Sequence, residues 1–281
     1  MFCGKCGTKI NDGDVFCTNC GARVVVNNVA GNNNSSNEKS DSSALVTKIK
    51  NVKCISEYSD ETEVDEMETI EFGSYPQSDA SGKSKEPIEW IVLEKSNDSA
   101  FLMAKYILDC KTYGVYNDFR TDHPCWENSI LRKWLNTEFY SVAFNNSEKE
   151  LIKTTKVANI PNYYNKDEKA TEDKIFCLSI EEVGKYFNRK IDEYDKFSEN
   201  ECKKLATYGT IYAKNVDNDG NKLYEEKIGM WFDNNHPFWL RSHGNDQGDG
   251  SEICSDGKIC QCTVVSCTYI GVRPAMWIKL K

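Results

Sequence analysis

Four cysteines near the start of the chain have the spacing of a tetrahedral metal site. Two residues separate Cys3 from Cys6 and Cys17 from Cys20, and ten residues lie between the two pairs. Two intervening residues let both thiolates of a pair reach one metal from a tight turn, and four thiolates leave Zn²⁺ no open position. We therefore expect one structural zinc ion, which supplies folding energy that so short a segment cannot obtain from a core.

The other cysteines and the charge balance limit where the protein acts and on what. The chain has 281 residues, thirteen cysteines and a formal net charge of −9. An odd number of cysteines, no signal-peptide pattern and no apolar run of the roughly 18–20 residues that a membrane span needs favour a reduced, cytoplasmic protein. An acidic chain without a sizeable basic patch is not expected to bind nucleic acid, because phosphate binding requires positive charge.

Composition divides the chain into three regions. Residues 1–26 contain the zinc site. Residues 27–68 are rich in Asn, Ser and acidic side chains and have too little apolar surface to offset the entropy of ordering, so we expect a flexible linker. Scattered apolar residues at 44–55 indicate one short helix or strand within it. Residues 69–281 have the patterns of a globular domain.

Strand patterns occur at both ends of this large domain, and helix patterns occur in its middle. Strands are expected at 87–93, 100–104, 174–178, 238–242 and 271–280. One helix is expected to bury a face made of Ile130, Leu131, Trp134, Leu135 and Phe139. Ser179 and Glu182 have the spacing of a capping box at the start of another helix. This order of elements predicts an α+β fold.

A predicted hairpin near the end of the chain contains several cysteines that could form a second site. Asp256-Gly257 favours a two-residue type I′ turn, which would pair Cys254 with Ile259 and place Cys254 on the face opposite Cys260 and Cys262. A regular hairpin of this register cannot gather the sulfurs of Cys254, Cys260, Cys262 and Cys267 around a second metal, whereas a bulge could. A redox-sensitive pair of Cys260 and Cys262, which share a face, is the other interpretation.

The first 24 residues, MFCGKCGTKINDGDVFCTNCGARV, resemble the short zinc ribbons that begin many bacterial proteins. Some such ribbons bind nucleic acid. Here Lys5, Lys9 and Arg23 are nearly balanced by Asp12 and Asp14, which favours docking to a protein. The alternative is that the ribbon only stabilises this end of the chain.

Several motifs of the large domain form a recognisable set. They include FGSYPQSD (72–79), PIEWIVL (87–93), WENSILRKWLN (126–136), FWLRSHG (238–244) and GVRPAMWI (271–278). Residues 70–281 thereby resemble a bacterial domain of unassigned function that often follows a zinc ribbon. That domain is related to the C-type-lectin-like group, which includes formylglycine-generating enzymes and the variable proteins of diversity-generating retroelements. The resemblance implies a C-type-lectin-like fold in which the first and last strands pair and two helices pack beside a small twisted sheet.

The resemblance also implies that ligands contact the loops between the last strands, here residues 243–270. The candidate ligand-binding residues are His243, Asn245, Asp246, Gln247, Asp249, Gln261, Ser266 and Tyr269. We therefore expect a non-catalytic protein that binds an unknown protein or small ligand. An ordinary solvated loop is the alternative, and the Asp-rich stretch 246–256 could bind a hard cation. The ending GVRPA matches the pattern after the variable residues of retroelement proteins, which a template copy near the gene would test.

An enzyme is the other class considered. Cys262 and Cys267 have the Cys-x4-Cys spacing with which formylglycine-generating enzymes hold copper, but they lie nearer to the GVR segment than in that family. The chain has three histidines and no phosphate loop, G-x-S-x-G or H-E-x-x-H motif. No catalytic residue is therefore predicted. Four tryptophans and three arginines are expected to belong to the core and scaffold: Trp90, Trp134, Trp239, Trp277, Arg132, Arg241 and Arg273.

Overall fold

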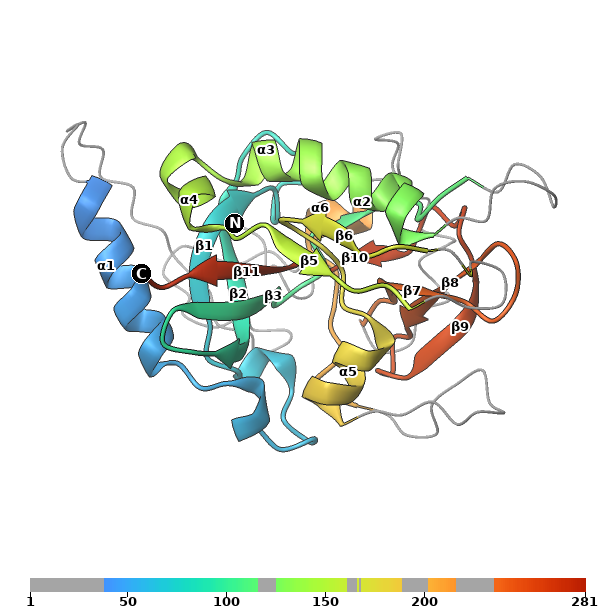
Figure 1. Cartoon of the computed structure of the whole chain (residues 1–281), viewed down its shortest axis with the longest axis horizontal. Helices are drawn as coiled ribbons and strands as arrows, with labels where there is room; N and C mark the ends of the chain where they lie inside the picture. The colour runs from blue at the N-terminus through green and yellow to red at the C-terminus, as the bar shows by residue number, and fades with distance from the viewer. Residues whose placement is uncertain (1–37, 116–124, 161–165, 167, 189–201, 216–234) are drawn as a thin grey trace, which may run out of the picture. The chain divides into compact units, whose positions relative to one another are not determined.

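The computed structural model describes residues 38–115, 125–160, 166, 168–188, 202–215 and 235–281. Contacts divide the chain into two units, Met1–Ser42 and Ser43–Lys281. The second unit is a mixed α/β domain of curled sheets and short helices (Figure 1). No helix within these described ranges is both long and apolar enough to cross a bilayer. The predicted zinc ligands Cys3, Cys6, Cys17 and Cys20 lie outside them.

The first sheet is antiparallel and has the strand order β1-β2-β3-β11. Its strands are β1 (Ile70–Tyr75), β2 (Glu86–Lys95), β3 (Ser99–Ala104) and β11 (Ala275–Lys279). Every residue of β3 is buried, as expected for a strand paired on both sides. The expected pairing of the domain's first and last strands is wrong: β11 pairs with β3, so β1 and β11 occupy opposite ends of the strand order.

The second sheet has the order β4-β10-β7-β8-β9. Its strands are β4 (Asp109–Cys110), β10 (Gly271–Val272), β7 (Phe238–His243), β8 (Asp249–Ile253) and β9 (Ile259–Val264). The β10–β7 pair is parallel, and the others are antiparallel. A separate ladder joins β5 (Thr155–Val157) to β6 (Thr171–Asp173). The segment that contains β10 and β11 therefore takes part in both large sheets.

A helical run covers one side of the domain along the top of Figure 1. It consists of α2 (Ile130–Trp134), the π-helical turn η4 (Leu135–Phe139), α3 (Tyr140–Ala143) and, after a break, α4 (Asn146–Leu151). Leu131, Trp134, Leu135 and Phe139 are buried as predicted, but Ile130 at the first turn is 42 % exposed. Ile130 immediately follows the N-cap Ser129, so it starts the helix at the surface.

Among the remaining helices, α1 (Glu38–Asn51) is the longest, with 14 residues, and the others have eight or fewer. The others are η1 (Ile55–Glu57), η2 (Val64–Glu66), η3 (Trp126–Asn128), α5 (Ile180–Phe187) and α6 (Ile211–Asn215). The predicted capping box of α5 is confirmed: Glu182 N donates to Ser179 Oγ at 3.1 Å, and Ser179 N donates to the Glu182 carboxylate at 3.0 Å. These two bonds satisfy backbone donors that the first turn leaves without intrahelical partners.

The domain begins earlier in the chain than composition predicts. Within the expected linker, five apolar side chains are buried in the domain core: Ile49, Val52, Ile55, Val64 and Met67. The acidic residues of this stretch also have partners, since Asp60 pairs with Lys204 at 2.7 Å and Asp65 accepts hydrogen bonds from two tyrosines. The prediction of a flexible linker is therefore wrong for residues 43–68, which belong to the domain. Spaced apolar residues suffice to hold an otherwise polar segment against a core.

Tryptophan and arginine have the scaffold roles expected of them. Trp90 and Trp239 are fully buried, and Trp277 is half-buried with its ring centroid 4.9 Å from that of Phe101. Arg273 is 1 % exposed and donates to three backbone carbonyls, and burial lowers its pKa. Two of these carbonyls belong to Ala104 and Lys105 and the third to Leu205, so the guanidinium joins the end of β3 to the segment 202–215.

Gly257 is needed at the tip of the β8–β9 hairpin. Its φ is +82°, and an added Cβ would lie 2.4 Å from the backbone oxygen of Cys202. Replacing Gly257 with Ala is therefore expected to lower the free energy of unfolding by more than about 1 kcal/mol, measured by urea unfolding. Gly209→Ala is the matched control, because its nearest neighbour is a side-chain atom at 3.5 Å. Equal losses in the two variants would contradict this explanation.

Candidate functional site

The candidate ligand-binding residues lie at one end of β7, β8 and β9, but the structure separates them into groups. The β7–β8 turn holds Asn245, Asp246 and Gln247, and the backbone N–H of Asn245 donates to Gln261 O on β9 at 2.7 Å. Asp249 begins β8 and pairs with Val264. Asn245 and Asp246 are exposed, and Gln247, Asp249 and Gln261 are half-buried. Five of the eight predicted residues therefore gather at this end of the sheet.

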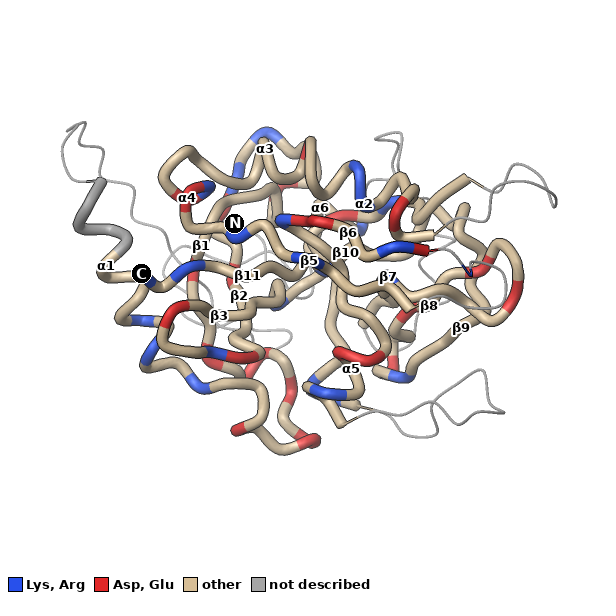
Figure 2. The backbone as a smooth tube through the Cα atoms, in the orientation of Figure 1, with Lys and Arg blue, Asp and Glu red and all other residues tan. Residues whose placement is uncertain are grey.

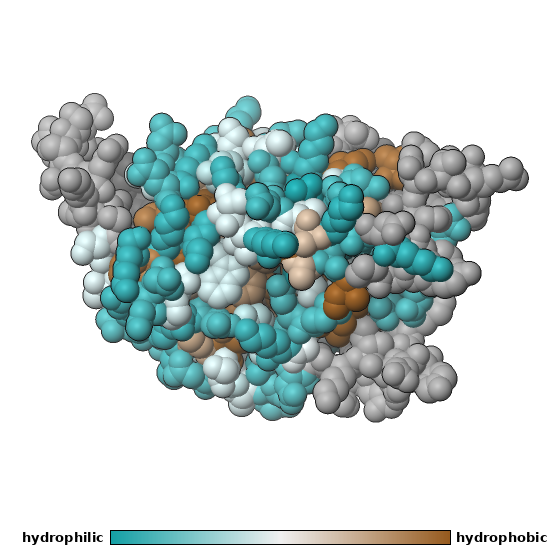
Figure 3. Space-filling view, in the orientation of Figure 1, coloured by the Kyte–Doolittle hydropathy of each residue, from teal (hydrophilic) through white to brown (hydrophobic). Residues whose placement is uncertain are grey.

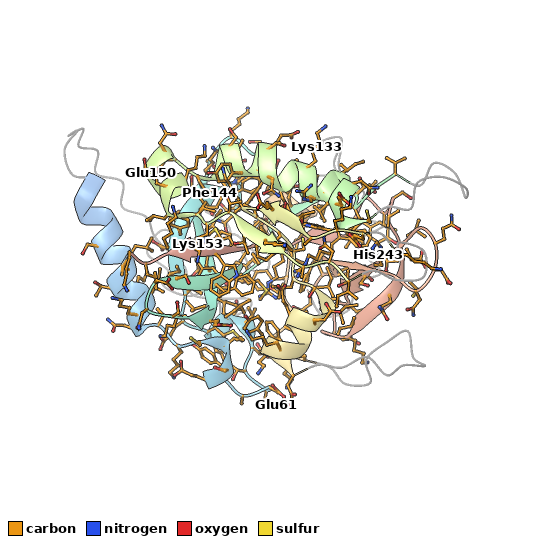
Figure 4. The ribbon with its side chains drawn as sticks, viewed as in Figure 1. Glu61, Lys133, Phe144, Glu150, Lys153 and His243 are labelled. Carbon is orange, nitrogen blue, oxygen red and sulfur yellow. The ribbon has the colours of Figure 1, made fainter. Side chains whose placement is uncertain are left out.

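The other three predicted residues have different surroundings. Ser266 is exposed in the loop after β9. Tyr269 is half-buried, and its hydrogen bond with Cys267 together with burial raises its pKa to about 12. His243, labelled in Figure 4, lies at the end of β7 and is only 8 % exposed. Its Nε2 contacts Glu168. The prediction that His243 belongs to an exposed binding loop is corrected, because the last residue of β7 points into the fold.

His243 lines a small polar pocket. The pocket is bounded by Ala158, Asn159, Ile160, Glu168, Ser179, Arg241, Ser242 and His243 and has room for about one water molecule. Arg241 anchors it, donating to Glu182 at 2.5 Å and to the carbonyls of Ala158 and Cys177 at 3.1 and 2.9 Å. The predicted scaffold role of Arg241 is therefore confirmed, and Glu182 serves both the guanidinium and the α5 capping box.

Two acceptors in this pocket are buried without a hydrogen-bond partner among the described residues, Glu168 Oε1 and Asn159 Oδ1. Residues 161–165 and 167, which adjoin both, lie outside the described ranges. An unsatisfied buried acceptor costs about 1–3 kcal/mol, so one water or ligand N–H at this point would be favourable. Sequence reasoning missed Asn159 and Glu168, because neither lies in a motif and His243 reaches Glu168 across 75 positions.

The β8–β9 hairpin brings together cysteines that the predicted register places on opposite faces. The structure pairs Ile253 with Ile259 and Glu252 with Cys260, one residue away from the predicted register. Gly257 N donates to Cys254 O, and Cys254 N donates to Lys258 O. Asp256 has a negative φ, because Asn188 is the only described non-glycine residue with a positive φ. This is a three-residue loop with Gly257 in the left-handed position, in place of the expected type I′ turn.

The one-residue shift changes which side chains share a face. Glu252, Cys254 and Cys260 now lie together, and their ligand atoms are all within 4.8 Å of one another. A bulge in the β8–β9 ladder follows between Glu252 and Gly250, and the sulfurs of Cys260 and Cys262 are 3.2 Å apart. The prediction that Cys254 lies opposite Cys260 is thus wrong, whereas the shared face of Cys260 and Cys262 is confirmed.

The electrostatics of this cluster are unusual for buried groups. Burial raises the pKa of Glu252 to about 8, and its Oε2 has no hydrogen-bond partner in the described part of the chain. A hydrogen bond between Cys254 and Cys260 lowers the pKa of Cys260 and raises that of Cys254. All nine described cysteines are thiols and none forms a disulfide.

Comparison with known families identifies both parts of the chain. Residues 97–280 match the model of a domain of unknown function, DUF6273, and residues 2–24 match a zinc-ribbon domain. The chain therefore belongs to the DUF6273 family and carries a zinc ribbon at its N-terminus. No curated protein matches the sequence. No solved structure matches it either.

Proposed function

We propose that this protein is a non-catalytic interaction protein whose zinc ribbon docks to one protein and whose DUF6273 domain binds another. The binding surface is the β7–β9 rim, which consists of Asn245, Asp246, Gln247, Asp249, Gln261, Val264 and Ser266. The ribbon contributes one structural zinc ion, held by Cys3, Cys6, Cys17 and Cys20.

The observation that carries the proposal is the convergence of two loops at the rim. The β7–β8 turn is joined to β9 by the Asn245 N–H to Gln261 O bond and to the segment after β9 by a bond of 3.0 Å from Val265 N to Gly248 O. Val264 is 46 % exposed between these polar neighbours. An apolar contact ringed by amides and carboxylates on a braced scaffold suits recognition of a protein surface.

The surrounding surface is consistent with this kind of recognition. Hydrophilic side chains cover most of the face seen in Figure 3, with apolar residues in scattered patches. Lys and Arg are interspersed with Asp and Glu over most of the described chain in Figure 2, whereas residues 57–68 carry acidic side chains alone. Specific binding would therefore depend on the local arrangement of the rim more than on one large apolar or charged patch.

The C-type-lectin-like relationship, and with it diversification of the loop by a retroelement, is the finer form of the proposal. It rests on the motif resemblance and on the place of the rim between the last strands. The second candidate is a metal- or cysteine-dependent enzyme related to formylglycine-generating enzymes. The clustering of Glu252, Cys254 and Cys260 favours that candidate, since it places reactive groups together.

Photo-crosslinking tests the rim directly. Benzoylphenylalanine at Val264 should yield a discrete crosslinked partner in lysate of the source cells, because this position lies within the rim. The same probe at Val142 on α3, which is 45 % exposed, is the matched control and should not yield that adduct. The partner would then be purified and titrated against the full-length protein by calorimetry.

Three substitutions in the rim complete this test. Asn245→Ala, Asp246→Ala and Gln261→Ala together should weaken binding of the purified partner at least about tenfold, while thermal stability stays near that of the wild type. The proposal fails if Val264 and Val142 give the same adducts, or if the triple variant binds with unchanged affinity.

A further inference from the structure

Four side chains of the β8–β9 hairpin form a cluster outside the β7–β9 rim. Glu252 lies on β8, Cys254 is the first residue after this strand, and Cys260 and Cys262 lie on β9. One ligand atom from each of Glu252, Cys254 and Cys260 falls within 4.8 Å of the others, and Cys262 Sγ is 3.2 Å from Cys260 Sγ. We propose that these four residues bind a second zinc ion, separate from that of the ribbon.

The backbone explains why the four side chains converge. The three-residue loop sets the register that puts Glu252 opposite Cys260, and alternation brings Cys254 to the face of Glu252. Cys262 lies in the bulge between Cys260 and Thr263, where its sulfur is 3.2 Å from that of Cys260. A tetrahedral zinc site with Zn–S distances of about 2.3 Å has sulfurs about 3.8 Å apart. The sulfurs of Cys260 and Cys262 are closer than this, at 3.2 Å, and Cys262 lies outside the group of ligand atoms that are within 4.8 Å of one another, so rotation of the Cys262 side chain would be needed to complete the site.

Glu252 gives independent evidence for a cation. It is 8 % exposed, and its Oε2 is buried with no hydrogen-bond partner in the described ranges. Buried carboxylate oxygens are normally hydrogen-bonded or bound to metal, because an unsatisfied one is costly. A zinc ion held by the neighbouring sulfurs would satisfy this oxygen.

The donor set decides the class of metal. Three thiolates with one carboxylate are too soft for Ca²⁺ or Mg²⁺, which take oxygen ligands. Thiolates and a carboxylate in four-coordinate, tetrahedral geometry suit Zn²⁺. Four protein ligands leave no open position, so the ion would be structural and would join β8 to β9 close to the rim.

Metal content of the full-length protein tests the proposal. Native mass spectrometry of reduced protein supplied with Zn²⁺ should show two zinc ions. The ribbon variant Cys17→Ser/Cys20→Ser should keep one, and adding Cys254→Ser/Cys260→Ser to it should leave none. Cys54→Ser/Cys125→Ser in the ribbon variant is the control and should keep one, because these thiols lie elsewhere in the fold.

A second measurement covers the case in which the double cysteine variant fails to fold. Co²⁺ titrated into the ribbon variant should give sulfur-to-cobalt charge-transfer absorption, and Glu252→Gln should weaken Co²⁺ binding at least about tenfold while retaining that absorption. The proposal would be overturned if the ribbon variant bound no zinc and gave no charge-transfer absorption with Co²⁺. A disulfide between Cys254 and Cys260, or between Cys260 and Cys262, would also overturn it if the protein purified without reductant then bound no zinc. Such a disulfide would lower the mass by two hydrogens. Neither result would affect the crosslinking test of the rim.

Discussion

Replacing Arg273 with Met is expected to lower the free energy of unfolding by about 3–5 kcal/mol. Arg273 Nε donates to Ala104 O at 2.8 Å, and its two terminal nitrogens donate to Leu205 O and Lys105 O at 2.8 and 3.0 Å. Methionine fills similar space but has no donor. Ala104 O and Leu205 O would lose the bonds from Arg273, each at a cost of about 1–3 kcal/mol, whereas Lys105 O would keep its bond of 3.0 Å from Thr207 Oγ1.

Urea unfolding followed by tryptophan fluorescence measures this effect. Lys133→Met is the control, since Lys133 is exposed and points outward from α2 in Figure 4. An exposed substitution of this kind should change stability by less than about 0.5 kcal/mol. A loss below about 1 kcal/mol in Arg273→Met would contradict the joining role assigned to the guanidinium.

Asp173→Ala should have the second largest effect, a loss of about 3–4 kcal/mol. The carboxylate is 1 % exposed and accepts from Trp126 Nε1 at 2.9 Å, Arg132 Nε at 2.6 Å and Thr171 Oγ1 at 2.6 Å. Removing it leaves a buried indole N–H and a partly buried guanidinium without their acceptor. The loss should be visible as a lower midpoint in urea and a lower Tm.

The neighbouring Glu172 provides the control for Asp173. Glu172 is exposed on the same strand, so Glu172→Ala should leave stability nearly unchanged. Arg132→Met should partly rescue Asp173→Ala in a double-mutant cycle, because the double variant no longer holds an uncompensated cation. Strictly additive losses would show that the Arg132–Asp173 pair is not coupled.

Local patterns in the sequence predicted local structure well. The capping box of Ser179 and Glu182 and the buried face of Leu131, Trp134 and Leu135 depend on residues close together in the chain, and both are found. The zinc-ribbon spacing is likewise a local pattern, and the family comparison agrees with it. The α+β order of elements also follows from such patterns.

Features that depend on distant contacts could not be predicted. The partner of Arg132 is Asp173, 41 positions away, and nothing in either local sequence marks the pair. The hairpin is a second case, because Asp256-Gly257 is compatible with both a two-residue and a three-residue loop. This difference of one residue in loop length decides whether Cys254 and Cys260 share a face. The linker prediction failed for a related reason, because mean composition conceals Ile49, Ile55 and Met67.

The place of β10 and β11 in the two sheets has a consequence for synthesis of the protein. Gly271–Val272 lies between β4 and β7, and Ala275–Lys279 pairs with β3, so neither sheet has its full set of strands until this segment leaves the ribosome. Such non-local pairing gives a high contact order, which slows folding. The domain can therefore complete its fold only once Lys279 has left the ribosome, and shorter nascent chains would expose unpaired strands that chaperones recognise.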